Sequence, residues 1–186
     1  MRLKDKVGLI FFILTAILAG FSAAANSSLL AWLSVPYYLT LAFLYTRRRP
    51  ASRWNRTGLW LGLIAAFLPM ASYPRTIPWP LTLFGLAGYA LIFWSLLALG
   101  RSFGIAPADR GLVTNGPYRF VRHPMYLGEL AFRCALVAAS LTIGNIALML
   151  VMAAFQVARI FLEERIIDGY EDYIGETRWR FIPGVW

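Results

Sequence analysis

The amino-acid sequence predicts an all-α fold, a polytopic bundle of transmembrane helices with a polar C-terminal segment on the cytoplasmic side. Three observations predict the bundle: an apolar composition, apolar runs of membrane-spanning length, and basic residues confined to alternate connections. Of 186 residues, 59% are hydrophobic and only 15% are charged, and the mean hydropathy is +0.61. A soluble domain of this size would not tolerate such a composition, so a lipid bilayer must be the solvent.

Six apolar runs are candidates for transmembrane helices. The first and the fourth contain 19 residues each, and as helices they would cover about 28 Å of the roughly 30 Å hydrocarbon core. The third is the weakest, because it has only 14 residues and contains Pro69 near its end. We therefore predict six spans, with five as the alternative. The runs are residues 7–25, 29–45, 58–71, 81–99, 126–143 and 146–162.

The positions of the Lys and Arg residues predict how the chain crosses the membrane. If all six runs cross, 16 of the 18 basic residues fall on or near one side, Arg75 falls on the other, and Arg133 lies well inside a run. Cytoplasmic connections carry an excess of basic residues, so both termini are expected in the cytoplasm. The net charge is +9. Because the basic residues lie between apolar runs, they indicate contact with membrane lipids and no nucleic-acid partner.

No repeat or change of composition divides the chain, so residues 1–186 are interpreted as one integral membrane domain. Residues 1–99 hold four N-terminal spans, and residues 100–186 hold a catalytic region with a helical hairpin and the C-terminal segment. The two longest polar segments, 100–124 and 163–186, both fall on the predicted cytoplasmic side. Cys134 is the only cysteine and His123 the only histidine, which excludes an intramolecular disulfide and predicts that no metal is bound.

The polar segment before the fifth run has the pattern of a turn followed by a helix start. Gly116 and Pro117 favour the turn, and Pro124 suits the first turn of a helix. Arg122 and His123 then lie just outside the helix, where free backbone N–H groups and a guanidinium would form an anion site. The alternative is an interfacial anchor, in which the arginine binds lipid phosphate and the histidine has no role.

Two further clusters of charge accompany the last two runs. Arg159 and Glu163 are four residues apart and can pair on one helix face, while Glu164 lies about 100° further around the helix. Glu129 and Arg133 are also four apart and lie inside the fifth run, where charges are costly and usually functional. We interpret both clusters as parts of a polar site. The alternatives are a solvated helix end and a self-neutralising structural pair.

Taken together, these motifs resemble the isoprenylcysteine carboxyl methyltransferase family and the related phospholipid methyltransferases. The resemblance covers residues 99–186. It implies S-adenosylmethionine as methyl donor, bound in a cytoplasmic pocket closed by the C-terminal segment, and a lipophilic or prenylated acceptor that arrives from the bilayer. The residues that carry it are GPYRFVRHPMY at 116–126, RxxxEE at 159–164, Tyr170 with Tyr173, and Arg180 with Ile182 and Pro183.

The resemblance also implies roles for single residues. The start of the fifth run would take the methionyl carboxylate, and Glu163 or Glu164 would hold the ribose hydroxyls or the amino group. A carboxylate acceptor would be oriented by Arg159, or else by Arg133, without a general base, whereas an amine or hydroxyl would need Glu129 as the base. The cofactor-binding group comprises Tyr118, Arg122, His123, Pro124, Tyr126, Glu163, Glu164, Tyr173 and Arg180.

Other functions remain open beside a carboxyl methyltransferase. A phospholipid N-methyltransferase would share the motifs, and an NADPH-dependent membrane reductase of the sterol-reductase type carries a similar His and Tyr region. A small transporter could use Glu129 and Arg133 to line a path. The sequence contains no GxGxxG fingerprint, so the fold of the soluble methyltransferases is not expected.

Overall fold

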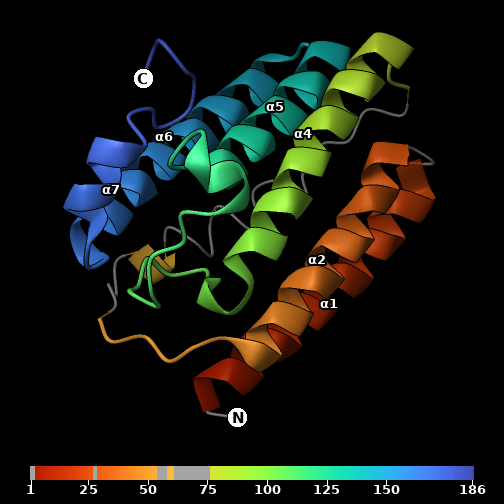
Figure 1. Ribbon diagram of the computed structural model, residues 1–186. Coiled ribbons are helices and arrows are strands. Elements are labelled where there is room, and N and C mark those ends of the chain that lie inside the picture. The colour runs from red at the N-terminus through yellow and green to blue at the C-terminus, as the bar shows by residue number, and fades with distance from the viewer. Residues whose placement is uncertain (1–2, 27–28, 54–57, 61–75) are drawn as a thin grey trace.

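Four long apolar helices form the frame of the structure (Figure 1). The computed structural model describes residues 3–26, 29–53, 58–60 and 76–186. Within that part of the chain, four helices are long and apolar enough to cross a membrane, which confirms the predicted transmembrane bundle. Most of the third predicted span, 58–71, lies outside the described residues. The four helices are α1 (Leu3–Asn26), α2 (Leu29–Arg47), α4 (Trp79–Leu99) and α6 (Ile143–Ile166).

A shorter helix, α5 (Pro124–Ala139), lies between α4 and α6 in the sequence and packs along α4. Its 16 residues cover about 24 Å. It begins at Pro124, where the sequence predicts a helix start, and it ends earlier than the predicted fifth run. Helix α6 begins at Ile143, earlier than the predicted sixth run, because the Thr142 hydroxyl accepts a hydrogen bond from the Asn145 N–H at 3.1 Å and caps the helix.

Glycines allow α4 and α5 to approach each other closely. A Cβ atom added at Gly128 would lie 2.7 Å from the carbonyl oxygen of Gly88, and one added at Gly88 would lie 2.8 Å from the backbone nitrogen of Phe132. Small residues at such a crossing let two backbones touch, which is how helices gain contact within a bilayer. The Tyr89 hydroxyl also donates to the Leu33 carbonyl and joins α4 to α2. The position of α5 is therefore fixed by backbone contact.

The start of α1 and the ends of α2, α4 and α6 lie at one end of the bundle (Figure 1). The same end carries three short elements: η2 (Gly100–Ser102), η3 (Gly116–Arg119) and α7 (Tyr170–Glu176). Polar contacts between segments far apart in the sequence hold this end together. They are Arg48 with Asp5 at 2.6 Å, the Arg49 N–H with the Arg101 carbonyl at 2.7 Å, Ser52 with Asp109 at 2.6 Å, and Arg53 with Asp168 at 3.0 Å.

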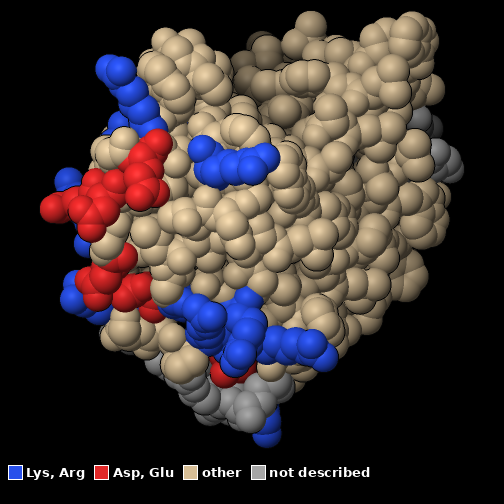
Figure 2. Space-filling view, viewed as in Figure 1, with Lys and Arg blue, Asp and Glu red and all other residues tan. Residues whose placement is uncertain are grey.

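The outer surface of the helices is apolar, as a bilayer requires. Phe21 and Leu97 are each 72% exposed, and Ile143 is 89% exposed. Figure 2 shows this surface as a broad area without charge, with basic and acidic side chains confined mainly to its left and lower parts. Large exposed apolar areas of this kind are rare on soluble monomers and indicate contact with lipid. The polar end of the bundle is therefore the place to search for chemistry.

Candidate active site

The start of α5 and the end of α6 meet through a buried ion pair. Arg122 lies just before α5 and is 6% exposed, and its Nη1 atom is 3.0 Å from Oε1 of Glu164. Glu164 also accepts two hydrogen bonds from Arg180, at 2.9 and 2.8 Å. One carboxylate thus binds two guanidinium groups. It joins α5, α6 and the segment after α7, as strong charge-assisted pairs can.

His123 lies between two tyrosine rings and two carboxylates. Its ring is stacked on Tyr126, with 5.7 Å between the centroids, and on Tyr170, with 6.3 Å. The Tyr170 hydroxyl is 3.0 Å from Nε2. Nε2 is also 3.5 Å from Glu164, and Nδ1 is 3.8 Å from Glu163. The imidazole is 5% exposed, so its orientation is set by the Tyr126 ring and by the Tyr170 hydroxyl at Nε2.

Tyr126, Glu163 and Arg159 form the next layer along the two helices. The Tyr126 hydroxyl donates to Oε1 of Glu163, and the same oxygen is 3.6 Å from Nη2 of Arg159, as the spacing of four residues predicts. The Arg159 guanidinium also donates to the Ile105 carbonyl at 3.0 Å and lies 4.9 Å from the centroid of the Tyr126 ring. Arg159 is buried, and three different partners hold it in place.

The C-terminal segment covers the start of α5. The backbone N–H groups of Arg122 and His123 donate to the carbonyls of Trp179 and Arg180, at 2.8 and 3.0 Å. Two N–H groups that the sequence analysis assigned to an anion site are therefore bonded within the chain. Because Arg122 is also paired with Glu164, its charge mainly holds the helix ends together.

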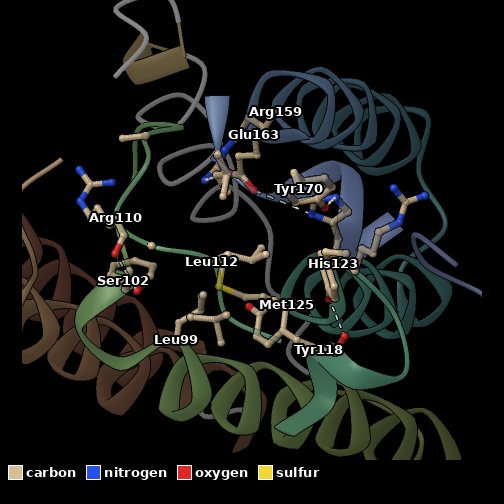
Figure 3. Close-up of a pocket in the computed structure, with 18 of the residues that line it drawn as sticks. Leu99, Ser102, Arg110, Leu112, Tyr118, His123, Met125, Arg159, Glu163 and Tyr170 are labelled. Carbon is tan, nitrogen blue, oxygen red and sulfur yellow. Dashed lines mark hydrogen bonds and ion pairs between the residues drawn. The ribbon is translucent and has the colours of Figure 1, made fainter. Parts of the chain in front are cut away.

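A pocket lies beside these helix ends, between the segment that follows α4, the starts of α5 and α7, and the end of α6 (Figure 3). Arg159 and Glu163 lie together on one wall, with His123 and Tyr170 next to them. Leu112 and Met125 supply apolar surface. Seven of the residues predicted from the sequence line this pocket: Tyr118, Arg122, His123, Tyr126, Arg159, Glu163 and Tyr173.

Five predicted site residues do not line the pocket. Glu164 binds the lining residue Arg122 and also Arg180, and Pro124 is the first residue of α5. Glu129 lies one turn beyond Met125 on α5; its carboxylate accepts hydrogen bonds from the Tyr37 hydroxyl at 2.9 Å and from the Gln156 amide at 2.8 Å. Arg133 lies further along α5, with its guanidinium carbon 5.8 Å from the centroid of the Phe132 ring. Four of the other lining residues were not assigned to the site from the sequence, although one of them, Tyr170, belongs to the motifs of the resemblance. They are Ser102, Gly104, Arg110 and Tyr170.

Three tyrosines around the pocket remain protonated. Burial raises the pKa of Tyr118 well above its ordinary value, and burial likewise raises the pKa of Tyr170. Burial raises the pKa of Tyr173 to about 12. At physiological pH these phenols are therefore neutral and can donate hydrogen bonds, but they do not serve as bases. In the described part of the chain, no group of His, Cys, Asp and Glu side chains is arranged to hold a metal ion.

Tyr173→Phe is expected to loosen the cover over the pocket. The Tyr173 hydroxyl donates to the Tyr118 carbonyl at 2.5 Å and ties α7 to η3. Its removal leaves a buried carbonyl without a partner, which costs about 1–3 kcal/mol of stability. Thermal unfolding should show the loss, and limited proteolysis should cleave the segment after α7 sooner than in the wild type. An unchanged cleavage rate would contradict this role.

Comparison with known proteins agrees with these motifs. Residues 80–170, which make up about half of the chain, match the phospholipid methyltransferase family. The matched segment runs from the start of α4 to the start of α7 and contains both helix ends that meet at the pocket. A search of curated proteins found no match. Over residues 80–170 the chain is therefore similar to the phospholipid methyltransferase family, and this match indicates a membrane methyltransferase.

Proposed function

We propose that the chain transfers a methyl group from S-adenosylmethionine to a lipophilic acceptor at the cytoplasmic membrane face, as a carboxyl O-methyltransferase of the isoprenylcysteine type. The observation that carries this proposal is that the start of α5 lies against the end of α6. Arg122, His123, Glu163 and Glu164 come together there beside a pocket. The family match supports the reaction class. The residues that meet there are those to which the resemblance assigns the methyl donor.

The groups in the pocket fit S-adenosylmethionine, which combines a carboxylate, an ammonium, a sulfonium and an adenine ring. Glu163 and the stacked rings of His123 and Tyr126 suit a positive charge. Buried Nε atoms of Arg122 and Arg159 have no hydrogen-bond partner in the described part of the chain, so they offer donors to an anion. We assign the donor to Tyr118, Arg122, His123, Tyr126, Glu163 and Tyr173, with Pro124, Glu164 and Arg180 supporting them.

The residues of the pocket would act mainly by alignment and by excluding water. When bound, S-adenosylmethionine supplies a methyl group on a sulfonium, and its transfer to a carboxylate oxygen requires no proton transfer. Alignment of two reactants contributes most of the rate in such a displacement. The buried rings of Tyr126 and Tyr170 next to His123 would keep water from this part of the site.

Arg159 is the residue that we assign to the acceptor carboxylate, with Arg133 as the second choice. Contacts with the Ile105 carbonyl and the Tyr126 ring fix the Arg159 guanidinium, and a rigid planar guanidinium suits a carboxylate. Glu129 is the base that an amine acceptor would need. Its carboxylate already accepts two hydrogen bonds and does not line the pocket, which supports a carboxylate acceptor.

Arg159→Lys is expected to lower the rate of methyl transfer about 100-fold, because a lysine keeps the charge but loses the planar hydrogen-bonding face that orients the acceptor. Binding of the methyl donor should change much less than the rate. Arg165→Lys is the matched control, since Arg165 lies on the same helix and is exposed. Rates measured with labelled donor in membranes should separate the two variants, and equal rates would remove Arg159 from the acceptor site.

The reaction itself can be tested in membranes incubated with radiolabelled S-adenosylmethionine. After lipid extraction and alkaline treatment, base-labile label would indicate a methyl ester and support the proposal. Stable label in phospholipid would indicate N-methylation, the second candidate, which the description of the matched family favours. Saturable binding of NADPH without binding of S-adenosylmethionine would overturn both and favour a membrane reductase. Binding of neither would favour a transporter.

A further inference from the structure

Three arginines line the pocket, and two of them have a carboxylate partner. Arg122 is paired with Glu164 at 3.0 Å, and Arg159 lies 3.6 Å from Glu163. The third is Arg110, in the segment between α4 and η3. Among the described residues, no carboxylate forms an ion pair with Arg110, and its Nε atom is buried without a hydrogen-bond partner.

The acidic side chains around Arg110 have other partners, and Glu163 on the pocket wall is bound to Tyr126 and Arg159. Asp109, its neighbour in the sequence, accepts hydrogen bonds from the Ser52 hydroxyl at 2.6 Å and from the Gly111 N–H at 3.1 Å. Asp5 is paired with Arg48 at 2.6 Å. These contacts hold Asp109 and Asp5 in place with partners other than Arg110.

Asp5 and Glu163 act on Arg110 only from a distance, and neither forms an ion pair with it. Burial lowers the pKa of Arg110, and the neighbouring guanidinium of Arg48 lowers it further. Arg110 is only partly buried, but its Nε atom is buried, and a cation in such a place is costly without an ion-pair partner, the more so with a second cation nearby. A ligand that brings an anionic group to Arg110 would remove both penalties. Figure 2 shows that basic side chains gather near the end of α4, on the lower part of the face in view.

The local backbone is arranged around the Arg110 guanidinium. A Cβ atom added at Gly104 would lie 2.5 Å from Nη1 of Arg110, so the guanidinium lies directly against the Gly104 backbone. The Ser102 hydroxyl donates to the Arg110 carbonyl at 3.1 Å and fixes the backbone. Both residues line the pocket. In Figure 3, Arg110 and Ser102 lie on the opposite side of the pocket from His123 and Tyr170.

We propose that Arg110 forms an anion subsite at the α4 end of the pocket, which binds a carboxylate or phosphate group of a ligand. This subsite lies apart from the helix ends that meet at Glu164. For the identity of the ligand it rests on the proposed function, which offers two sources of such a group: the carboxylate of the methyl donor and an acidic group of the lipid acceptor. The charge of the ligand group is the same in both cases.

The first test needs neither ligand. The full chain in neutral detergent is unfolded by heat in inorganic phosphate and in chloride at equal ionic strength. Phosphate should raise the Tm of the wild type more than chloride does, because an ion that binds only the folded state stabilises it. The extra rise should be lost in Arg110→Gln and retained in Arg110→Lys. Arg119→Gln, an exposed arginine outside the pocket, should behave as the wild type.

Two further measurements distinguish the sources of the anion. If the subsite takes the donor carboxylate, Arg110→Gln should weaken binding of S-adenosylmethionine at least 10-fold and leave binding of its decarboxylated analogue unchanged. If it takes the acceptor, donor binding should be unchanged. In Arg110→Gln, free palmitate should then no longer compete with a photo-crosslinking palmitate probe. Hexadecanol, which lacks the carboxylate, should compete as well as it does in the wild type.

The subsite is overturned if Arg110→Gln and the wild type respond alike to phosphate, bind both donor analogues alike and crosslink palmitate alike. Failure of the proposed function has a different signature. In that case the wild type itself binds no S-adenosylmethionine, while the difference between phosphate and chloride still reports on Arg110. The two conclusions therefore stand or fall separately.

Discussion

Glu164→Gln is expected to destabilise the protein by about 3–5 kcal/mol, because it leaves buried positive charge without a partner. Glu164 binds Arg122 at 3.0 Å and Arg180 at 2.8 Å, and the Arg122 side chain is only 5% exposed. The glutamine keeps the shape of the side chain and removes its charge. The segment after α7 should detach from the start of α5, and affinity for the methyl donor should fall with it.

The measurements are thermal unfolding, limited proteolysis of the C-terminal segment, and binding of S-adenosylmethionine. Glu176→Gln is the matched control, since Glu176 is an exposed acid on α7 and should change stability by less than about 0.5 kcal/mol. Adding Arg180→Gln to Glu164→Gln should cost less than the sum of the single changes, because it removes one of the unpaired charges. Equal stability of Glu164→Gln and Glu176→Gln would refute the role given to Glu164.

Gly128→Ala should destabilise the protein by about 1–3 kcal/mol through overpacking, although alanine is the better helix former. The added Cβ would lie 2.7 Å from the Gly88 carbonyl oxygen and 3.0 Å from the Ile92 backbone nitrogen. Neither atom belongs to a side chain that can rotate away, so α5 must move from α4. Since α5 begins at the site, donor affinity should fall as well.

Gly20→Ala is the control for this change. Gly20 lies in α1, and a Cβ there would be 3.9 Å from the nearest atom, a methyl carbon of Val35, which is ordinary contact. That variant should be as stable as the wild type or slightly more stable, because the helix gains propensity without a clash. The two alanine substitutions should therefore shift the Tm in opposite directions. A shift of the same sign in both would argue against close contact between α4 and α5.

The sequence predicted the long helices well, because the length of an apolar run and the thickness of a bilayer are tied by helix geometry. It also located the start of α5, since Pro124 restricts the residue before it and suits the first turn. The spacing of Arg159 and Glu163 predicted their contact for the same local reason. In each case the information lies within a few residues of the feature.

The grouping of distant segments at the site was expected only through the family resemblance, and the individual contacts between them were not predicted. Nothing near Arg122 and His123 indicates that residues 179 and 180 accept their backbone hydrogen bonds. Arg110 was missed because its importance depends on what surrounds it: room at Gly104, and acids that are already paired. Glu129 was expected to work with Arg133, four residues away, yet hydrogen bonds from Tyr37 on α2 and Gln156 on α6 hold its carboxylate. Such partners depend on tertiary packing.

The contact between Tyr37 and Glu129 bears on how the two halves of the chain assemble in the membrane. An acidic side chain that faced hydrocarbon alone would be costly, so α5 needs a polar partner as it enters the bilayer. Because the phenol comes from α2, the first helical hairpin supplies the polar partner that Glu129 needs within the bilayer. The same hydrogen bond sets how α5 is rotated about its axis relative to α2. Two fragments made by cutting the chain between α2 and α4 should consequently find each other when co-expressed, and Tyr37→Phe should weaken that reassociation.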